Sequence, residues 1–258
     1  MDYETLKVRV QDEICFMQIH RPEANNAIND RLIEELVRVL DRHGSEVKIV
    51  VLEGLPGVFC FGADFKAIEQ SLQHRTSGPV LDPRPMYELW QRLASGPWIT
   101  IAHVRGQANA GGIGFVAACD IVLADETASF ALSELLFGLM PACVLPFLMR
   151  RIGRSRANAM TLMTEPVSAK CAQAWGLVDE TAEDSVNLLR KKLLRLRRLS
   201  KSAIERYKRY MTALDDTPAA SKALALEANI EVFSDEDNLH KIARYVRTGQ
   251  FPWEQAGR

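Results

Sequence analysis

The sequence lacks the features that mark secreted, membrane-spanning and nucleic-acid-binding proteins. Its five cysteines are odd in number and never spaced as C-x-x-C, which argues against a disulfide framework or a zinc site. With 33 acidic and 32 basic residues the formal charge is −1, whereas a dedicated nucleic-acid binder is strongly basic. The longest uncharged run, Leu135 to Met149, is too short to span a bilayer. Because no basic, apolar-cored signal opens the chain, we expect a soluble cytoplasmic protein with no membrane or nucleic-acid partner.

The common catalytic motifs are absent as well. There is no G-x-S-x-G, H-E-x-x-H, Walker or G-x-G-x-x-G pattern in the chain. The histidines are scattered, so a structural or surface role is expected for each of them: His20, His43, His74, His103 and His240. We therefore expect no metal and no redox cofactor.

The chain does contain an alternation of short apolar runs and amphipathic segments. Four runs are typical of buried strands: Ile14–Ile19, Ile49–Leu52, Ile99–Val104 and Ile121–Ala124. Between the first two, apolar residues recur at helical spacing, with Asp30 as the expected N-cap and Gly44 as the expected C-cap. This alternation predicts an α/β fold with parallel strands and crossover helices.

The second half of the chain has a different pattern. Beyond Cys143 it is helical almost to the end, with Ser168 and Gly176 as expected caps of one short helix. Three final helices are expected from about Asp184 onward, so we divide the chain into a core over residues 1–183 and a helical region over residues 184–258. The proline-rich stretch His74–Pro85 predicts a surface loop that could border a site.

Two glycine-containing turns are the strongest candidates for chemistry. Phe61-Gly62-Ala63-Asp64 follows one predicted strand and opens a helix, and Ala110-Gly111-Gly112-Ile113-Gly114 does the same after another. Backbone N–H groups at a helix start are unpaired and have the helix dipole behind them, so two facing turns would form an oxyanion hole. The alternative is that these glycines only allow close packing of helix on strand.

Several separated motifs, in order, resemble those of the enoyl-CoA hydratase/isomerase (crotonase) superfamily over residues 6 to 250. The matching segments are Arg21–Asn29 (R-P-x-x-x-N-A-L-N), Phe59–Lys66 (F-x-x-G-A-D-[IL]-K), Val104–Gly112 (V-x-G-x-A-x-G-G-G), Cys119–Ile121 (C-D-[IL]) and Ala128–Pro141. The resemblance implies a ββα spiral core followed by a C-terminal helical trimerisation region. It also implies trimers or dimers of trimers.

The resemblance assigns roles to individual residues. Backbone N–H groups of Ala63 and Gly111 would hold a thioester carbonyl as its enolate develops, and Glu134 aligns with the second catalytic glutamate of hydratases. As a plain alternative, Glu134 is a carboxylate favoured at a helix start. Substrate or pantetheine contacts are expected from the residues beside the turns: Phe61, Gly62, Phe65 and Gly112.

Departures from the family pattern limit the reactions that the chain is expected to catalyse. Gly114 occupies the position of the first catalytic glutamate, and Ala110 replaces a glycine, so water addition by two carboxylates is disfavoured. Glu134 alone could remove a C2 proton and then protonate a departing hydroxyl if both lie on one face. Asp64 is the alternative second acid, although its place at a helix start favours an N-cap.

Within the superfamily the chain most resembles the 3-hydroxy-3-methylglutaryl-ACP dehydratases of polyketide β-branching cassettes. The similarity is densest in Val50–Pro56, Ser133–Met149 and Gly249–Glu254. Sibling decarboxylases carry a lysine and a histidine where this chain has Phe65 and Asn229. The resemblance implies dehydration of the carrier-bound substrate to a 3-methylglutaconyl group. The alternatives are a conventional enoyl-CoA hydratase or isomerase, a sibling decarboxylase, and a non-catalytic scaffold or RNA-associated member of the same fold.

An acyl carrier protein is the expected partner, presenting a phosphopantetheine-linked substrate. From Arg190 to Arg209 ten residues are lysine or arginine and Glu205 alone is acidic. This run is either a solvated face of two helices, with Leu189, Leu193, Leu196 and Leu199 inward, or an attractive surface for the acidic carrier. Three cations are candidates for the substrate's distal carboxylate on position alone: Lys66, Arg84 and Arg92.

Overall fold

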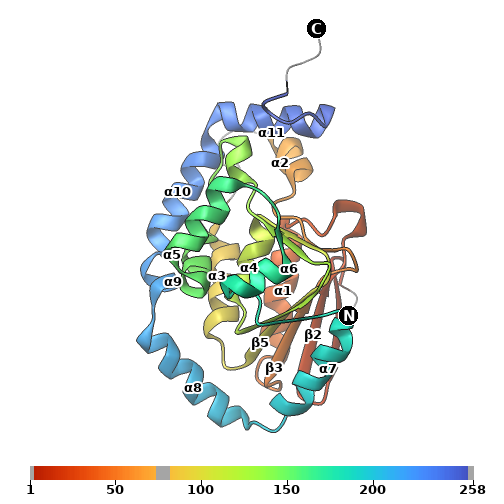
Figure 1. Ribbon diagram of the computed structural model, residues 1–258. Coiled ribbons are helices and arrows are strands. Elements are labelled where there is room, and N and C mark those ends of the chain that lie inside the picture. Colours follow the sequence, from red (N-terminus) through yellow and green to blue (C-terminus); the bar gives the residue numbers. More distant parts are fainter. Residues whose placement is uncertain (1–2, 74–81, 255–258) are drawn as a thin grey trace.

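A computed structural model describes residues 3–73 and 82–254 (Figure 1). The main sheet has six strands in the order β1-β2-β3-β5-β7-β10, with β1 antiparallel to β2 and the remaining neighbours parallel. Its strands are β1 (Leu6–Gln11), β2 (Ile14–Ile19), β3 (Ile49–Glu53), β5 (Ile99–Val104), β7 (Ile121–Asp125) and β10 (Glu180–Ala182). The four predicted strands are confirmed, whereas β1 and β10 were not predicted.

A second, smaller sheet lies beyond the main one in the order β4-β6-β8-β9. It consists of β4 (Val58–Cys60), β6 (Gln107–Asn109), β8 (Ser129–Ala131) and β9 (Val167–Ser168). Neighbours β4, β6 and β8 are parallel, and β9 is antiparallel to β8. Each of the three parallel strands follows a strand of the main sheet and precedes a helical segment, which is the ββα repeat that the family resemblance implied.

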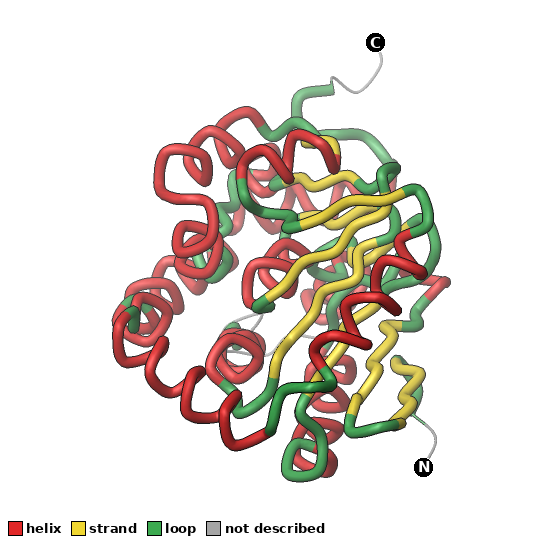
Figure 2. Tube along the Cα trace, turned by 60° about the horizontal axis from the view of Figure 1, so that its bottom comes forward, coloured by secondary structure: helices red, strands yellow, loops and turns green. Residues whose placement is uncertain are grey.

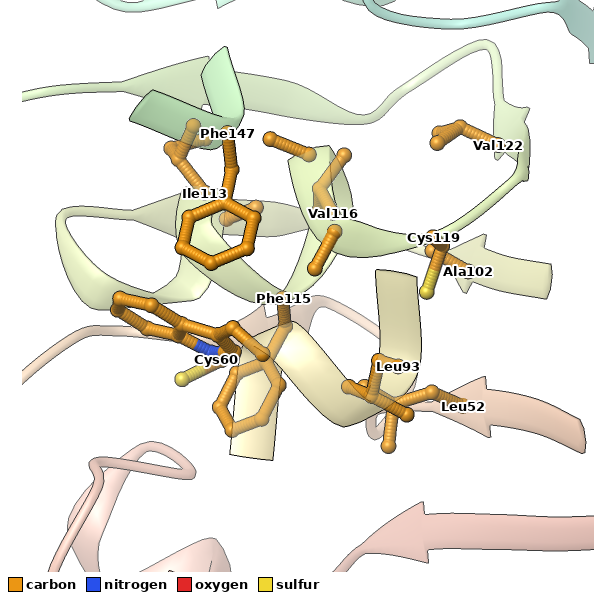
Figure 3. Packing of buried hydrophobic residues seen from close by; sticks show 14 of the residues in the cluster. Leu52, Cys60, Leu93, Ala102, Ile113, Phe115, Val116, Cys119, Val122 and Phe147 are labelled. Carbon is orange, nitrogen blue, oxygen red and sulfur yellow. The ribbon is translucent and has the colours of Figure 1, made fainter. Parts of the chain in front are cut away.

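The helices before residue 184 cover and fill the space around the two sheets. They are η1 (Pro22–Ala24), α1 (Asp30–His43), α2 (Phe65–Gln73), α3 (Arg84–Ser95), α4 (Gly111–Ala118), η2 (Glu134–Phe137), α5 (Leu145–Met163) and α6 (Ala169–Trp175). Helix α4 is apolar on all sides and is buried from Gly112 to Ala118, as expected of a helix inside a core. Figure 3 shows Ile113, Phe115 and Val116 of α4 packed near Leu93 of α3 and Phe147 of α5.

The predicted helix caps are confirmed with one correction. Asn29, not Asp30, caps α1, because its Oδ1 accepts a hydrogen bond of 2.9 Å from the Leu32 N–H. Gly44 ends α1, and Ser168 and Gly176 bracket α6 as predicted.

Between residues 185 and 248 the described chain forms five helices, not the three expected. They are α7 (Ser185–Leu196), α8 (Lys201–Leu214), α9 (Thr217–Ala220), α10 (Lys222–Ser234) and α11 (Glu236–Thr248). Leu189 and Leu193 of α7 pack on the main sheet. Figure 2 shows a helix lying across the strands of this sheet. Leu199 was expected to face inward, but it lies past the end of α7 and its exposed fraction is 45%.

At the opposite end of the molecule, α11 packs against α2 (Figure 1). Part of the loop predicted over His74–Pro85, residues 74–81, lies outside the described residues. None of the described helices combines the length and the apolar character needed to cross a bilayer.

Candidate active site

Three segments that follow the parallel strands of the small sheet come together at one edge. Ala63 follows β4, Gly111 follows β6 and Glu134 follows β8, each at the corresponding place in its ββα repeat. Because β6 lies between β4 and β8, and all three run in the same direction, their carboxyl ends lie at the same edge of the sheet. This edge is where open α/β sheets place their ligands. The topology therefore brings together the three residues that were predicted to share a site.

Ile28 holds the first turn so that the Ala63 N–H points away from Ile28. The Ile28 N–H donates to Gly62 O at 2.7 Å, and the Asp64 N–H donates to Ile28 O at 3.0 Å. These bonds pair Ile28 with the residues on both sides of Ala63, as in a one-residue parallel β-bridge. The peptide groups of Ala63 consequently face the opposite direction, and its N–H has no partner among the described residues.

The second turn lies directly against the first. Gly62 has a φ of +91°, and a Cβ there would lie 2.7 Å from the Ala110 Cβ and 3.3 Å from the Gly111 nitrogen. Gly111 begins α4, and within the described chain its N–H also has no backbone acceptor. Two unpaired donors thus lie on facing turns, with the α4 dipole behind one of them.

The alternative role predicted for the glycines, close packing, also holds. A Cβ on Gly112 would lie 2.4 Å from Cys60 O, so this buried glycine brings α4 onto β4. Ala110 adopts φ 50° and ψ −121°, a conformation that favours glycine. The turn therefore stores backbone strain beside the candidate oxyanion hole.

Glu134 starts η2 beside these turns. Asn109, next to Ala110, donates from Nδ2 to Ser133 Oγ at 3.0 Å, and the Ala110 N–H donates to Ala131 O at 3.0 Å, so the second turn is tied to the Glu134 segment. Asn109 Oδ1 and Glu134 Oε2 are both buried without a hydrogen-bond partner in the described part of the chain. These unsatisfied acceptors indicate a site that is prepared for a hydrogen-bonding ligand.

Burial raises the pKa of Glu134 from 4.5 to about 7, and the backbone N–H groups of Glu134 and Ser133 oppose this rise only in part. A carboxyl group with this pKa is present in both protonation states near neutral pH. It can accept a proton from carbon and return it to a leaving group, which suits a general acid and base.

Asp64 occupies the position of an N-cap. Its Oδ1 accepts from the Ala67 N–H at 3.1 Å in the first turn of α2, and its Oδ2 forms an ion pair of 2.9 Å with Arg21 Nη2. Both oxygens are engaged in holding the turn in place. The structure therefore supports capping, the alternative that the sequence favoured, over a role as second acid.

The aromatic residues beside the first turn have different environments. Phe61 is 40% exposed next to Gly62, so its ring is available to a bound thioester arm. Phe65 instead packs edge-on against Phe137 at 5.1 Å and against Tyr245 at 6.5 Å, joining α2 to η2 and α11. Its ring shapes the wall behind Ala63, which packs against the same cluster.

The three cations considered for the substrate's distal carboxylate have different surroundings. Arg92 pairs with Asp41 at 2.7 Å, which links α3 to α1. Lys66 and Arg84 are exposed at the starts of α2 and α3. Within residues 3–73 and 82–254 no group of three His, Cys, Asp or Glu is arranged to hold a metal ion.

Sequence reasoning missed Ile28, which orients the first turn, and Trp90, which fills the space beside Gly114. Ile28 lies in the segment Arg21–Asn29 that carried the family resemblance, so its motif was a usable signal. Trp90 has no such signal, because only the packing of α3 on α4 brings it to Gly114.

The chain is similar to known proteins over nearly all of its length. The family described as enoyl-CoA hydratase/isomerase matches residues 9–256. The chain is 58% identical over 253 residues to the bacillaene synthase dehydratase PksH of Bacillus subtilis, covering 98% of this chain and 97% of that protein. It is 32% identical over 186 residues to the 2,3-dehydroadipyl-CoA hydratase of Escherichia coli, covering 71% of each chain.

Solved structures show the same similarity. A crystal structure of a Bacillus subtilis protein described as a polyketide biosynthesis enoyl-CoA hydratase (pksH) superposes with a TM-score of 0.95 at 56% identity, covering 97% of this chain and all of the other. An enoyl-CoA hydratase from Mycobacterium avium superposes with a TM-score of 0.83 at 25% identity, covering 98% and 99% of the two chains.

Proposed function

We propose that this chain, which belongs to the enoyl-CoA hydratase/isomerase family and is a hydro-lyase of the crotonase superfamily, acts as a dehydratase in polyketide biosynthesis. Its substrate is a 3-hydroxy-3-methylglutaryl group on an acyl carrier protein, and its product is the 3-methylglutaconyl group. The similarity to the bacillaene synthase dehydratase over nearly the whole of both chains supports this choice. The observation that carries the mechanism is the Glu134 carboxyl, whose Oε2 has no partner in the described chain and whose pKa is raised to about 7, at the same sheet edge as the unpaired N–H groups of Ala63 and Gly111.

The proposed reaction begins at the thioester carbonyl. Its oxygen accepts hydrogen bonds from the Ala63 and Gly111 N–H groups, and the ionised Glu134 removes one proton from C2. Charge then builds on the oxygen toward which both donors already point, and each such donor contributes roughly 3–4 kcal/mol in a transition state. The enolate is thereby stabilised without any oxidation or reduction.

The second step releases water. The enolate electron pair forms the C2–C3 double bond as the C3–O bond breaks, and Glu134 returns its proton to the departing hydroxyl. The proton taken from C2 and the hydroxyl from C3 together form the water that leaves. Glu134 therefore ends in its starting state, and we propose that no metal or redox cofactor takes part.

The same carboxyl group can serve both steps only if the C2 proton and the C3 hydroxyl lie on one face of the substrate. Gly114 offers no side chain to assist from a second position. This favours a single-base dehydratase over a conventional two-carboxylate hydratase.

Carrier-protein recognition is assigned to the basic face of α7 and α8. Six of its exposed cations are Arg190, Lys191, Arg195, Arg198, Arg206 and Arg209. The other four cations of the run are engaged within the chain: Lys192 pairs with Glu180, Arg197 pairs with Asp12, Lys208 pairs with Asp120, and Lys201 donates to Gly44 O and Ser45 O. The exposed cations would attract an acidic carrier protein or the phosphate of its pantetheine arm.

We also propose that the chain assembles as a trimer or a dimer of trimers. Support comes from α8, where Tyr207, Tyr210, Met211 and Leu214 expose 43–63% of their surface at helical spacing. In Figure 1 this helix runs along the outer edge of the molecule. A row of exposed apolar side chains of this kind is typical of a protein–protein contact.

The proposed function is tested by incubating the protein with 3-hydroxy-3-methylglutaryl thioester on carrier protein, on coenzyme A and on pantetheine. Loss of one water from the carrier-bound acyl group, detected by intact-protein mass spectrometry, is the expected result. Glu134→Gln serves as the inactive control. Hydration of crotonyl-CoA without any turnover of the branched substrate would instead establish a conventional hydratase, and loss of carbon dioxide would establish a decarboxylase.

A further inference from the structure

Trp90 of α3 fills the space where a side chain at position 114 would begin. A Cβ on Gly114 would lie 2.4 Å from Cζ2, 2.5 Å from Cη2 and 2.7 Å from Cε2 of the Trp90 indole. The indole therefore lies directly against the α4 backbone. Any side chain larger than hydrogen at position 114 requires it to move.

The position of this ring relative to the first turn of α4 follows from helix geometry. A Cα–Cβ bond tilts toward the N-terminus of its helix, so a substituent on Gly114 would lie over the preceding turn, which begins at Gly111. The indole atoms that occupy this place are consequently close to the end of α4 that carries the candidate oxyanion donor. The edge of the ring formed by Cε2 and Cζ2 also carries the attached Nε1.

The ring cannot easily turn to another orientation. It packs edge-on against Phe115 at 5.8 Å and against Phe147 at 5.9 Å, and its exposed fraction is 0% (Figure 3 shows both phenylalanines). Aromatic rings in such T-shaped contacts are held in a defined geometry. Trp90 thus presents its N–H in one fixed direction.

The Trp90 N–H is buried and has no acceptor among the residues that the structure describes. A buried donor left unpaired is unfavourable, because it loses its hydrogen bond to water without gaining another. An indole N–H only donates, so it cannot act as a base or carry a proton between groups. The Trp90 N–H is therefore free to donate to a bound molecule or to water.

We infer that Trp90 Nε1 donates a hydrogen bond to the C3 hydroxyl oxygen of the substrate, in the region where a side chain at position 114 would otherwise lie. This inference rests on the proposed function. The hydrogen bond stabilises negative charge on the oxygen as the C3–O bond breaks, while the proton that completes the water still comes from Glu134. The indole proton stays on Nε1, so the balance of the reaction is unchanged.

This arrangement distinguishes hydroxylated from unhydroxylated acyl groups. A substrate with a C3 hydroxyl satisfies the buried donor, whereas an analogue without it leaves the donor unpaired, as in other sites that reject a substrate lacking one polar group.

The test uses two buried tryptophans that share an unpaired N–H and a ring lying against glycine. Trp98 is 4% exposed, its Nε1 is also buried without a partner in the described residues, and its ring also lies against glycine positions, Gly44 and Gly96. Trp90→Phe and Trp98→Phe therefore remove the same N–H from similarly packed rings. Trp98→Phe controls for the loss of an indole that lies at the end of α1.

For Trp90→Phe we expect kcat for dehydration to fall about 10- to 100-fold, the range for one hydrogen bond to a group that gains charge. Trp98→Phe is expected to stay within about twofold of wild type. The 3-deoxy analogue 3-methylglutaryl-pantetheine is expected to bind Trp90→Phe at least as tightly as wild type, because this variant has no donor that the analogue leaves unpaired. Equal kcat values for Trp90→Phe and wild type would overturn the inference. If the wild-type protein itself releases no water, the proposed function fails instead.

A second measurement does not depend on the folding of a core variant. In Glu134→Gln protein labelled with 15N-tryptophan, the indole N–H resonance of Trp90 should shift when the 3-hydroxy-3-methylglutaryl pantetheine thioester binds. It should shift much less with the 3-deoxy analogue. Saturation with both ligands and the same Trp90 resonance in each would show that the hydroxyl does not meet the indole.

Discussion

Arg21 and Asp64 form an ion pair, with 2.9 Å between Nη2 and Oδ2, that joins the loop before α1 to the first turn of α2. Arg21 also donates from Nη1 to Ala27 O, next to the residue that orients Ala63. The carboxylate of Asp64 therefore holds one oxyanion turn against the segment that supports it. This arrangement supports our proposal that Asp64 has a positioning role and that Glu134 is the acid and base.

The first prediction separates these two carboxylates. Asp64→Asn keeps an oxygen that can cap α2 but loses the charge, so we expect dehydration within about tenfold of wild type, since such side-chain contacts contribute about 1 kcal/mol. Glu134→Gln should lose at least about 100-fold. Steady-state kinetics of dehydration by the two variants measures this difference. An equally large loss in Asp64→Asn would indicate that Asp64 is a second acid.

The second prediction concerns stability as a function of pH. The folded protein raises the pKa of Glu134 from 4.5 to about 7 by burial, so its ionised form is disfavoured in the folded state. Wild type should therefore lose stability relative to Glu134→Gln as pH rises through this range, by at most about 3 kcal/mol. Urea unfolding at pH 4 and pH 8 measures this difference. Glu165→Gln, an exposed substitution of the same kind, should show no such trend. A constant difference between Glu134→Gln and wild type would contradict the raised pKa.

The third prediction is that Gly114→Glu does not create a good hydratase. A glutamate there would have to displace the Trp90 indole, because a Cβ at position 114 would lie 2.4 Å from its Cζ2. Overpacking of this kind costs about 1–3 kcal/mol. Thermal denaturation should show a lowered Tm, and crotonyl-CoA hydration should stay far below that of a conventional hydratase. Efficient hydration by this variant would mean that the pocket is not closed by Trp90.

The fourth prediction tests the strain in the second turn. Ala110 adopts φ 50° and ψ −121°, so Ala110→Gly should relieve about 1–3 kcal/mol of strain, offset in part by the greater freedom of glycine in the unfolded chain. We expect a higher Tm by calorimetry, with dehydration retained. Ala108→Gly, on the neighbouring strand β6, is the matched control and should be destabilising. A lower Tm for Ala110→Gly would show that this backbone conformation carries no net strain.

The fifth prediction concerns the carrier protein. Reversal of two exposed charges, Arg198→Glu with Arg206→Glu, should lower kcat/KM for the carrier-bound substrate. Lys201 is unsuitable because its ammonium group is engaged with Gly44 and Ser45. The loss should shrink at high salt, because exposed charges are screened over a Debye length of about 8 Å at physiological ionic strength. Turnover of the free pantetheine thioester should be nearly unchanged.

The control for this experiment reverses the same amount of charge elsewhere, with Arg154→Glu and Lys170→Glu, both exposed outside the basic run. Equal losses in the two double variants would indicate a general charge effect. A loss on both substrates would implicate the fold or the pantetheine channel, and no loss would return the basic run to a solvated helix surface.

The long strands of the main sheet and the two turns could be predicted from the sequence because their signals are local. Ile49–Leu52 is a continuous apolar run, Ile99–Val104 is mostly apolar, and Gly111 begins the helix that follows the second of these strands and the short strand β6. Strands of two or three residues, such as β4 and β9, are too short to show any periodicity. For that reason no local pattern in the sequence predicted the small sheet on which the site lies, and only the family resemblance implied it.

The contacts that shape the site depend on residues far apart in the chain. Nothing near Gly114 indicates that Trp90 lies on it, since this follows from how α3 packs on α4. Likewise the N-cap of α1 is Asn29 and not Asp30, and the local sequence pattern does not distinguish between two neighbouring cap residues. Contacts of this kind follow from tertiary packing, which overrides the local signal.

The three ββα repeats contribute to the site in chemically different ways. Two repeats supply peptide N–H groups, which every residue except proline possesses, and the third supplies a carboxyl group that one substitution can remove. In the proposed mechanism, carbonyl binding therefore depends on the path of the backbone at Ala63 and Gly111 and not on their side chains. The proton-transfer function is encoded in a single side chain. Such a scaffold can change its reaction when side chains around the site are exchanged, while the backbone N–H groups continue to bind the thioester carbonyl.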